Sequence, residues 1–157
     1  MLIRALREEG RTFTQIRGSP MLRILVVDDD MAVRGAIKMV LEQDGHQVTL
    51  AANGRAGVAA VETGSFDLVI CDIFMPGMDG IETIHAFHRH NPQMPVIAMS
   101  GFMFRDGQSP APDYLTLSTK LGAAYSLRKP FRPHELLKAV RQCVTDASRD
   151  PEVKAAG

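Results

Sequence analysis

The chain has 157 residues, of which 45% are hydrophobic and 23% charged, a composition typical of a single globular domain. Its 18 basic and 18 acidic side chains balance, so net charge predicts neither nucleic-acid nor membrane binding. No apolar run approaches the roughly 20 residues of a membrane span, and residues 1–20 lack the apolar core of a secretory signal, so we expect a cytoplasmic protein.

The first half of the chain alternates apolar runs with helical patterns. Residues 1–20 show no pairing with later segments and are expected to be a flexible extension. Short apolar runs predict strands over 22–27, 48–51 and 66–71. Apolar residues at helical spacing predict a helix after each strand, with Asp30, Asn53 and Asp79 at the three helix starts and Gly45 and Gly64 ending the first two.

The second half continues this alternation after a long interruption. A fourth strand is expected over 95–99, followed by a polar loop over 100–112. Asp113 is placed to cap a helix, a fifth strand is expected over 123–127, and Pro133 lies near the first turn of a last helix. The small and charged residues from Asp146 onward predict a loose tail.

Strands that alternate with helices run parallel through right-handed crossovers and are covered on both faces. We therefore expect an α/β fold: a doubly wound, flavodoxin-like, five-stranded parallel sheet of order 2-1-3-4-5 with helices on both faces. Ligands of such sheets bind outside the carboxyl ends of the strands.

Polar residues follow the expected strands at that edge. They are Asp28 and Asp29 after the first strand, Asp72 after the third, Ser100 after the fourth and Lys129 after the fifth. Three carboxylates brought together repel one another, and Mg²⁺, which prefers oxygen ligands, would compensate them. A carboxylate can attack phosphorus to form an acyl phosphate, while an ammonium group and a hydroxyl contact the phosphoryl oxygens. This pattern predicts that Asp72 accepts phosphate, with Lys129 and Ser100 assisting.

These residues carry a resemblance to a known family. Asp28-Asp29 after an apolar run, the run from Asp72 to Gly80, Ser100 before Gly101, and Lys129 before Pro130 occur in the order typical of that family. From about residue 21 to residue 144, the chain resembles the receiver domain of bacterial two-component response regulators, typified by the chemotaxis regulator.

The resemblance implies a mechanism. Asp72 would be phosphorylated by a histidine kinase or a histidine phosphotransfer protein. Mg²⁺ would be bound by Asp29, Asp72 and the backbone carbonyl of Phe74, with Asp28 helping through water. The resemblance also implies a cis peptide before Pro130, which positions the preceding lysine.

The sequence departs from the family at the residues that report phosphorylation to a partner protein. The switch aromatic three residues before Lys129 is replaced by Ser126, and the neighbouring Tyr125 should point to the opposite face of the sheet. The loop over 100–112 is longer than is typical and contains bulky apolar residues at 102–104, so we expect an unusual partner surface. Phe74 overlooks the site, and we hypothesise that its ring shields the phosphoryl group from water.

Other interpretations of these residues exist. Asp28 and Asp29 taken alone would be read as helix caps. The histidines at 85, 88 and 90 suggest a metal site, but a solvated histidine face fits better because no nearby cysteine or acid completes it. Cys71 and Cys143 lie in apolar patterns far apart in sequence and are expected to be small buried residues.

Two rival functions fit part of this pattern. A magnesium-dependent aspartyl phosphatase or phosphotransferase usually carries a second acid two residues after its nucleophile, where this chain has Phe74. A receiver that acts as a phosphorylation-independent docking module is compatible with the missing aromatic. We expect a signalling protein rather than an enzyme.

The expected organisation is an extension over 1–20, a receiver domain over 21–146 and a tail over 147–157. Only 28 residues follow Lys129, which leaves no room for an output domain. We therefore expect a stand-alone regulator, or a receiver cut from a larger protein such as a hybrid kinase. It would be a monomer or weak homodimer that signals to a downstream protein without binding nucleic acid or membrane directly.

Overall fold

The computed structural model describes residues 20–75, 80–101 and 122–156 of the chain. The strands are β1 (Arg23–Val27), β2 (Gln47–Ala51), β3 (Leu68–Asp72), β4 (Val96–Ser100) and β5 (Tyr125–Arg128). The helices are α2 (Met31–Gln43), α3 (Gly54–Thr63), α4 (Gly80–His90) and α6 (Pro133–Ala156). The expected extension, the helix cap at Asp79, the apolar loop residues at 102–104 and the helix from Asp113 lie outside the described residues.

All five strands form one parallel sheet in the order β2-β1-β3-β4-β5, which confirms the predicted topology. The strand ends differ from the prediction by one or two residues. The most consequential shift is at β3, which includes Asp72 as its last residue. The five residues of β3 and the five of β4 are all buried, as expected for central strands covered on both faces.

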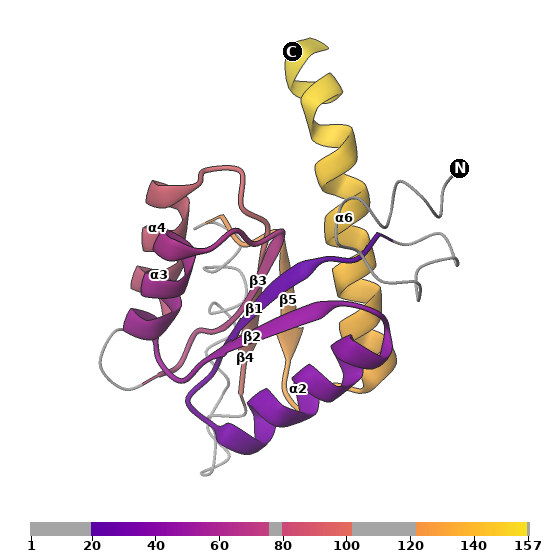
Figure 1. Ribbon diagram of the computed structural model, residues 1–157. Coiled ribbons are helices and arrows are strands. Elements are labelled where there is room, and N and C mark those ends of the chain that lie inside the picture. The colour runs from indigo at the N-terminus through magenta and orange to yellow at the C-terminus, as the bar shows by residue number, and fades with distance from the viewer. Residues whose placement is uncertain (1–19, 76–79, 102–121, 157) are drawn as a thin grey trace, which may run out of the picture.

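Two helical layers cover the sheet. Figure 1 shows α3 and α4 on one face and α2 and α6 on the other. Ile37, Leu41 and Leu136 are almost fully buried with alternate residues of the strands on the α2 and α6 side. Ile84 and Phe87 are fully buried on the α3 and α4 side. The side chains of each strand point alternately to the two faces, so each helical layer packs on its own apolar core.

The predicted ends of α2 and α3 are confirmed. Asp30 caps α2, accepting hydrogen bonds from the N–H groups of Ala32 at 2.8 Å and Val33 at 3.3 Å. Asn53 caps α3 in the same way. Gly45 follows α2 with a φ of 93°, a left-handed conformation that favours glycine. These caps fix where the chain leaves each strand and enters the next helix.

The expected loose tail from Asp146 is wrong. Helix α6 runs without interruption to Ala156 and extends beyond the sheet in Figure 1. An apolar repeat reports which helical face is buried, and it stops where the core stops. The sequence pattern therefore did not reveal that the helix continues past Asp146.

The register places the polar residues at one edge. Val27 pairs with Cys71, so Asp28 and Asp72 are the next residues on neighbouring strands. Ser100 pairs with Arg128, and Lys129 follows directly. The N–H of Lys129 donates to the carbonyl oxygen of Ser100 at 2.7 Å, which continues the β4–β5 ladder by one step.

Candidate functional site

Asp28 begins the site as a fully buried carboxylate. Its N–H donates to the carbonyl oxygen of Ala51 at 3.2 Å, so its backbone remains tied to the sheet. Its Oδ1 accepts from the N–H of Asp30 at 2.9 Å, and its Oδ2 lies 2.5 Å from the Nζ atom of Lys129. Each oxygen of this buried carboxylate therefore has a partner, as burial requires.

Asp72 lies beside it at the end of β3 and is 5% exposed. Its Oδ1 accepts from the N–H of Phe74 at 2.9 Å, and its Oδ2 accepts from Nζ of Lys129 at 3.0 Å. Burial raises the pKa of the Asp72 carboxyl, an effect opposed by the Phe74 N–H and by the Lys129 charge. The carboxylate is thus partly desolvated and held with one oxygen on the ammonium group.

Lys129 joins the two buried carboxylates. Burial alone would lower the pKa of its ammonium group, but hydrogen bonds and charge interactions with Asp28 and Asp72 outweigh burial and raise the pKa. The peptide between Lys129 and Pro130 is cis, as the resemblance implied. The ammonium group therefore remains charged, and it contacts the carboxylates of both Asp28 and Asp72.

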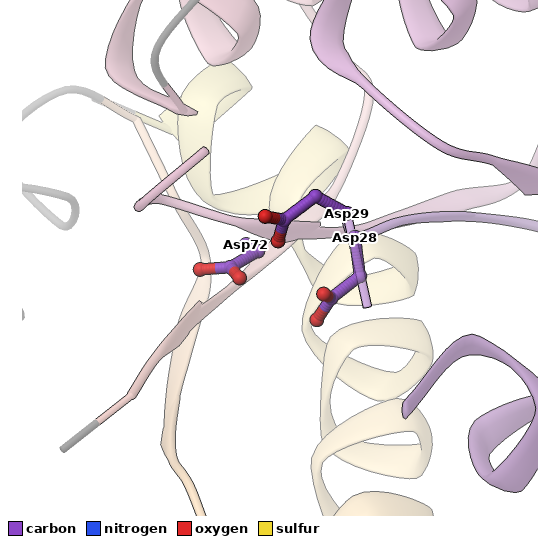
Figure 2. A group of neighbouring side chains, drawn as sticks. All are labelled: Asp28, Asp29 and Asp72. Atoms are coloured by element: carbon purple, nitrogen blue, oxygen red, sulfur yellow. The ribbon is translucent and has the colours of Figure 1, made fainter. Parts of the chain in front are cut away.

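Asp29 completes the acidic group from an exposed position. One carboxylate oxygen from each of Asp28, Asp29 and Asp72 lies within 4.8 Å of the others. Figure 2 shows the three side chains together where β1 and β3 end. Two members are buried and one faces solvent, so the group is open on one side.

This donor set fits a hard divalent cation. Carboxylate oxygens are the ligands that Mg²⁺ prefers, and Mg²⁺ usually takes only one or two of them and keeps several waters. Lys129 offsets one of the three negative charges. Asp29 is exposed, so that side of the group is accessible to water. Asp28, Asp29 and Asp72 are therefore the residues that could hold Mg²⁺.

Ser100 and Phe74 border the acidic group. Ser100 is buried at the end of β4, one strand from Asp72, and its main chain is bonded to Lys129. Phe74 is half-buried, and its ring packs against the apolar core on the α3 and α4 side. Its N–H is the group that orients Asp72. The structure therefore brings both predicted residues to the site.

Tyr125 and Ser126 point to opposite faces of β5, as the alternation of side chains along a strand requires. Tyr125 packs with Leu127 against the core on the α2 and α6 side. Ser126, which pairs with Ala98, is the intervening residue and points to the other face. The position expected to carry the switch aromatic therefore holds a serine, and the neighbouring tyrosine contacts a different helical layer.

The remaining predicted candidates do not join the site. His85 and His90 are exposed, whereas Nε2 of the half-buried His88 lies 3.0 Å from the carbonyl oxygen of Met94. In the described part of the chain, the three aspartates are the only group of acids, histidines or cysteines close enough to hold a metal. Cys71 and Cys143 are buried free thiols, as expected.

One contact at the site had no sequence signal. Arg34, in the second turn of α2, is half-buried, and its Nη1 donates to the carbonyl oxygen of Asp28 at 2.7 Å. In the sequence it is an ordinary arginine on a helix. Its contact depends on how the loop between β1 and α2 turns back over that helix.

Comparison with known proteins gives one consistent result. The family model described as "Response regulator receiver domain" matches residues 24–141. The transcriptional regulatory protein TcrA of Mycobacterium tuberculosis (strain H37Rv) is 33% identical over 146 residues, covering 88% of this chain and 51% of that protein. The transcriptional regulatory protein YkoG of Bacillus subtilis is 33% identical over 118 residues, covering 75% of this chain and 49% of that protein. The chain spans about half the length of these relatives.

Solved structures agree with the sequence comparison. The CheY-like receiver domain protein of Methanospirillum hungatei JF-1 superposes with a TM-score of 0.74 at 30% identity, covering 83% of this chain and 99% of that one. The chemotaxis protein CheY4 of Vibrio cholerae superposes with a TM-score of 0.69 at 28% identity, covering 79% of this chain and 99% of that one.

Within the described residues, no helix is both long and apolar enough to cross a membrane.

Proposed function

The chain belongs to the response regulator receiver domain family, and we propose that Asp72 is the residue on which this receiver takes up its phosphoryl group. Receivers of this family are phosphorylatable signalling modules of two-component systems. The observation that supports the assignment is the setting of Asp72. It ends the central strand β3, lies with two other carboxylates inside 4.8 Å, and has the Lys129 ammonium at 3.0 Å.

The proposed transfer is a displacement at phosphorus. A carboxylate oxygen of Asp72 attacks the phosphorus atom of a phosphohistidine or a small acyl phosphate. The bond from phosphorus to the donor nitrogen or oxygen breaks, its electron pair leaves with the donor, and Asp72 becomes an acyl phosphate. Attack requires the ionised carboxylate, and the Phe74 N–H and the Lys129 charge both favour that form.

The neighbouring residues have separate proposed roles. Lys129 would exchange its contacts with the acids for a phosphoryl oxygen, since its ammonium is already directed toward Asp72. Ser100 would offer its hydroxyl to another phosphoryl oxygen from the end of β4. Asp29, Asp72 and the Phe74 carbonyl would hold Mg²⁺, with Asp28 behind them. When bound, Mg²⁺ neutralises charge on the transferring group.

We propose a histidine kinase or a histidine phosphotransfer protein as the donor, and a protein contact as the output. The domain would extend over 21–146, slightly beyond the matched residues 24–141. The relatives TcrA and YkoG are named as transcriptional regulatory proteins, and this chain corresponds to about half of each. Regulation of transcription by this protein is therefore a proposal that extends beyond the receiver itself.

The test is direct phosphorylation of the purified protein. The protein is incubated with acetyl phosphate and Mg²⁺, and intact mass is measured over time. We expect one added phosphoryl group on the wild type, none on Asp72→Asn, and none on the wild type in EDTA. An adduct of equal yield on Asp72→Asn would refute the assignment.

A matched control guards against a general loss of structure. Asp67 is an exposed aspartate that precedes β3; its side chain accepts from the N–H of Arg23, and its own N–H donates to the Arg23 carbonyl oxygen. Asp67→Asn should be phosphorylated at the wild-type rate. If Asp67→Asn and Asp72→Asn lost the adduct equally, the effect would belong to folding and not to the acceptor.

A further inference from the structure

We propose that Arg34 is a positioning residue for Asp29 and thereby sets the affinity of the site for Mg²⁺. The inference rests on the proposed function, because it assumes that Asp29 binds the metal. The described side-chain hydrogen bond of Arg34 ends on the main-chain carbonyl oxygen of Asp28 and not on a carboxylate. It acts through the main chain of the loop between β1 and α2.

Arg34 holds the main chain of the loop between β1 and α2 through a hydrogen bond. Its side chain turns back over the start of α2, and Nη1 donates to the carbonyl oxygen of Asp28 at 2.7 Å. The residue is half-buried, and its own N–H donates to the carbonyl oxygen of Asp30 at 3.0 Å within the first turn. A charged donor at this distance forms one of the stronger hydrogen bonds available to a carbonyl.

A second hydrogen bond holds the main chain on the other side of Asp29. The N–H of Asp30 donates to Oδ1 of Asp28 at 2.9 Å. The Arg34 bond fixes the peptide group before Asp29, and the Asp28 bond fixes the peptide group after it. When both flanking peptide planes are fixed, φ and ψ of Asp29 are fixed, and so is the direction of its Cα–Cβ bond.

The fixed backbone determines where the exposed carboxylate of Asp29 lies. Asp29 is exposed, so no packed core holds its carboxylate near the two buried ones. Its place within 4.8 Å of Asp28 and Asp72 therefore depends on the backbone that carries it. Groups that orient metal ligands from outside the coordination shell commonly change metal affinity about 10- to 100-fold when they are removed.

The test measures Mg²⁺ binding directly. Isothermal titration with Mg²⁺ is performed on the wild type, Arg34→Met, Arg34→Lys and the control Lys38→Met. Lys38 lies one turn further along α2, where it pairs with Glu42, so its replacement removes one positive charge from the same helix without touching the loop. We expect Arg34→Met to weaken the Kd about tenfold, with Arg34→Lys between it and the wild type. Lys38→Met should stay within about twofold, because distant exposed charges are screened.

A second readout separates positioning from a merely structural role. The rate of phosphorylation by acetyl phosphate is measured as a function of Mg²⁺. For Arg34→Met we expect the half-saturating Mg²⁺ concentration to rise in step with the Kd, while the rate at saturating Mg²⁺ stays within about threefold of the wild type. A purely structural residue would lower the melting temperature and leave the half-saturating concentration unchanged.

Several outcomes overturn the proposal. A Kd for Arg34→Met equal to that of Lys38→Met does so, as does a lowered maximal rate at unchanged half-saturation. If circular dichroism shows that Arg34→Met does not fold, Arg34→Lys is compared with Lys38→Arg, and equal Kd values there overturn it as well. If the wild type binds no Mg²⁺, or Asp29→Asn binds it as the wild type does, the proposed metal site itself fails.

Discussion

The Nζ atom of Lys129 lies 3.0 Å from Oδ2 of Asp72, although the two residues are 57 positions apart in the sequence. The same atom lies 2.5 Å from Oδ2 of Asp28, which is fully buried. Lys129 is therefore the internal counter-charge of the two buried carboxylates. A divalent cation at the same acids would share that task, so the effects of removing the lysine and removing the metal should be coupled.

The first prediction tests this coupling with Lys129→Met, which keeps an unbranched apolar stem. Removing one partner of a buried ion pair leaves the other uncompensated, so the free energy of unfolding in EDTA should fall by about 3 kcal/mol. The loss should shrink when Mg²⁺ is saturating. Urea unfolding in EDTA and in Mg²⁺ measures both values, and an equal loss in the two conditions would contradict the coupling.

A second prediction has the opposite sign. Asp29→Asn removes a carboxylate from the acidic group while leaving the Lys129 contacts intact, so like-charge repulsion decreases. In EDTA the melting temperature should rise by about 2 °C, and the stabilisation by added Mg²⁺ should disappear. Thermal melts with and without Mg²⁺ decide this, and undiminished stabilisation by Mg²⁺ would show that Asp29 is not a ligand.

Gly80, at the start of α4, gives a third prediction. A Cβ on Gly80 would overlap the backbone of Asp72 and Ile73, which cannot yield as a flexible side chain could. Gly80→Ala should therefore lower the free energy of unfolding by about 3 kcal/mol. Gly35→Ala is the matched control, since Gly35 lies in the exposed interior of α2 with nothing within 4 Å of the added methyl group. It should raise stability by about 0.5–1 kcal/mol, and equal losses at both sites would contradict the close approach.

The fourth prediction concerns pH. His46 is buried, and its Nδ1 accepts from the N–H of Leu22 at 3.2 Å, while Nε2 lies 3.3 Å from Oδ2 of Asp44. Burial lowers the pKa of His46 below 6.5, although Asp44 partly opposes this; Arg141, which contacts Asp44 from α6, adds to the lowering. Because the unfolded chain binds the proton more tightly, stability is complete above about pH 6.5 and is lost as pH falls toward the folded pKa.

Unfolding free energies between pH 5 and pH 7.5 measure this loss. His46→Asn keeps an acceptor near the position of Nδ1 and does not titrate, so its stability should depend less steeply on pH. His85→Asn, at an exposed position on α4, should keep the wild-type slope. Identical slopes for the wild type and His46→Asn would rule out His46 as the source.

The fifth prediction follows from Phe74. Its ring packs on the apolar core that includes Cys71 and Ile73, the two sequence neighbours of Asp72. We expect it to limit the approach of water to a phosphoryl group on Asp72. Phe74→Asn should release phosphate several-fold faster than the wild type, while Phe74→Leu, which remains apolar, should change the rate less. Decay of the phosphorylated mass after removal of the donor measures this, and an unchanged rate in Phe74→Asn would contradict shielding.

Much of the fold could be predicted because its signals are local. Asp30 and Asn53 identify helix starts through their short acceptor side chains, and apolar runs identify strands. The meeting of Asp28, Asp72 and Lys129 is non-local, yet it follows from topology, since all parallel strands end at one edge. This is why the meeting of these residues could be predicted from the sequence.

Other features had no such signal. The hydrogen bond of Arg34 to the Asp28 carbonyl depends on the path of one loop, and an arginine on a helix carries no mark of its partner. The end of α6 was misplaced because a helix that outruns its core loses the apolar repeat that would reveal it. Periodicity reports contact with a core, and neither feature depends on such contact.

The two cysteines give each layer of this molecule its own reporter. Cys71 belongs to the core under α3 and α4, and Cys143 to the core under α2 and α6. Burial raises the pKa of both thiols, that of Cys143 to about 12, so neither reacts while its layer stays closed. The rate at which each thiol is alkylated in the native protein therefore measures how often one face of the sheet opens. Comparing the two rates before and after phosphorylation would show which face loosens when the signal arrives.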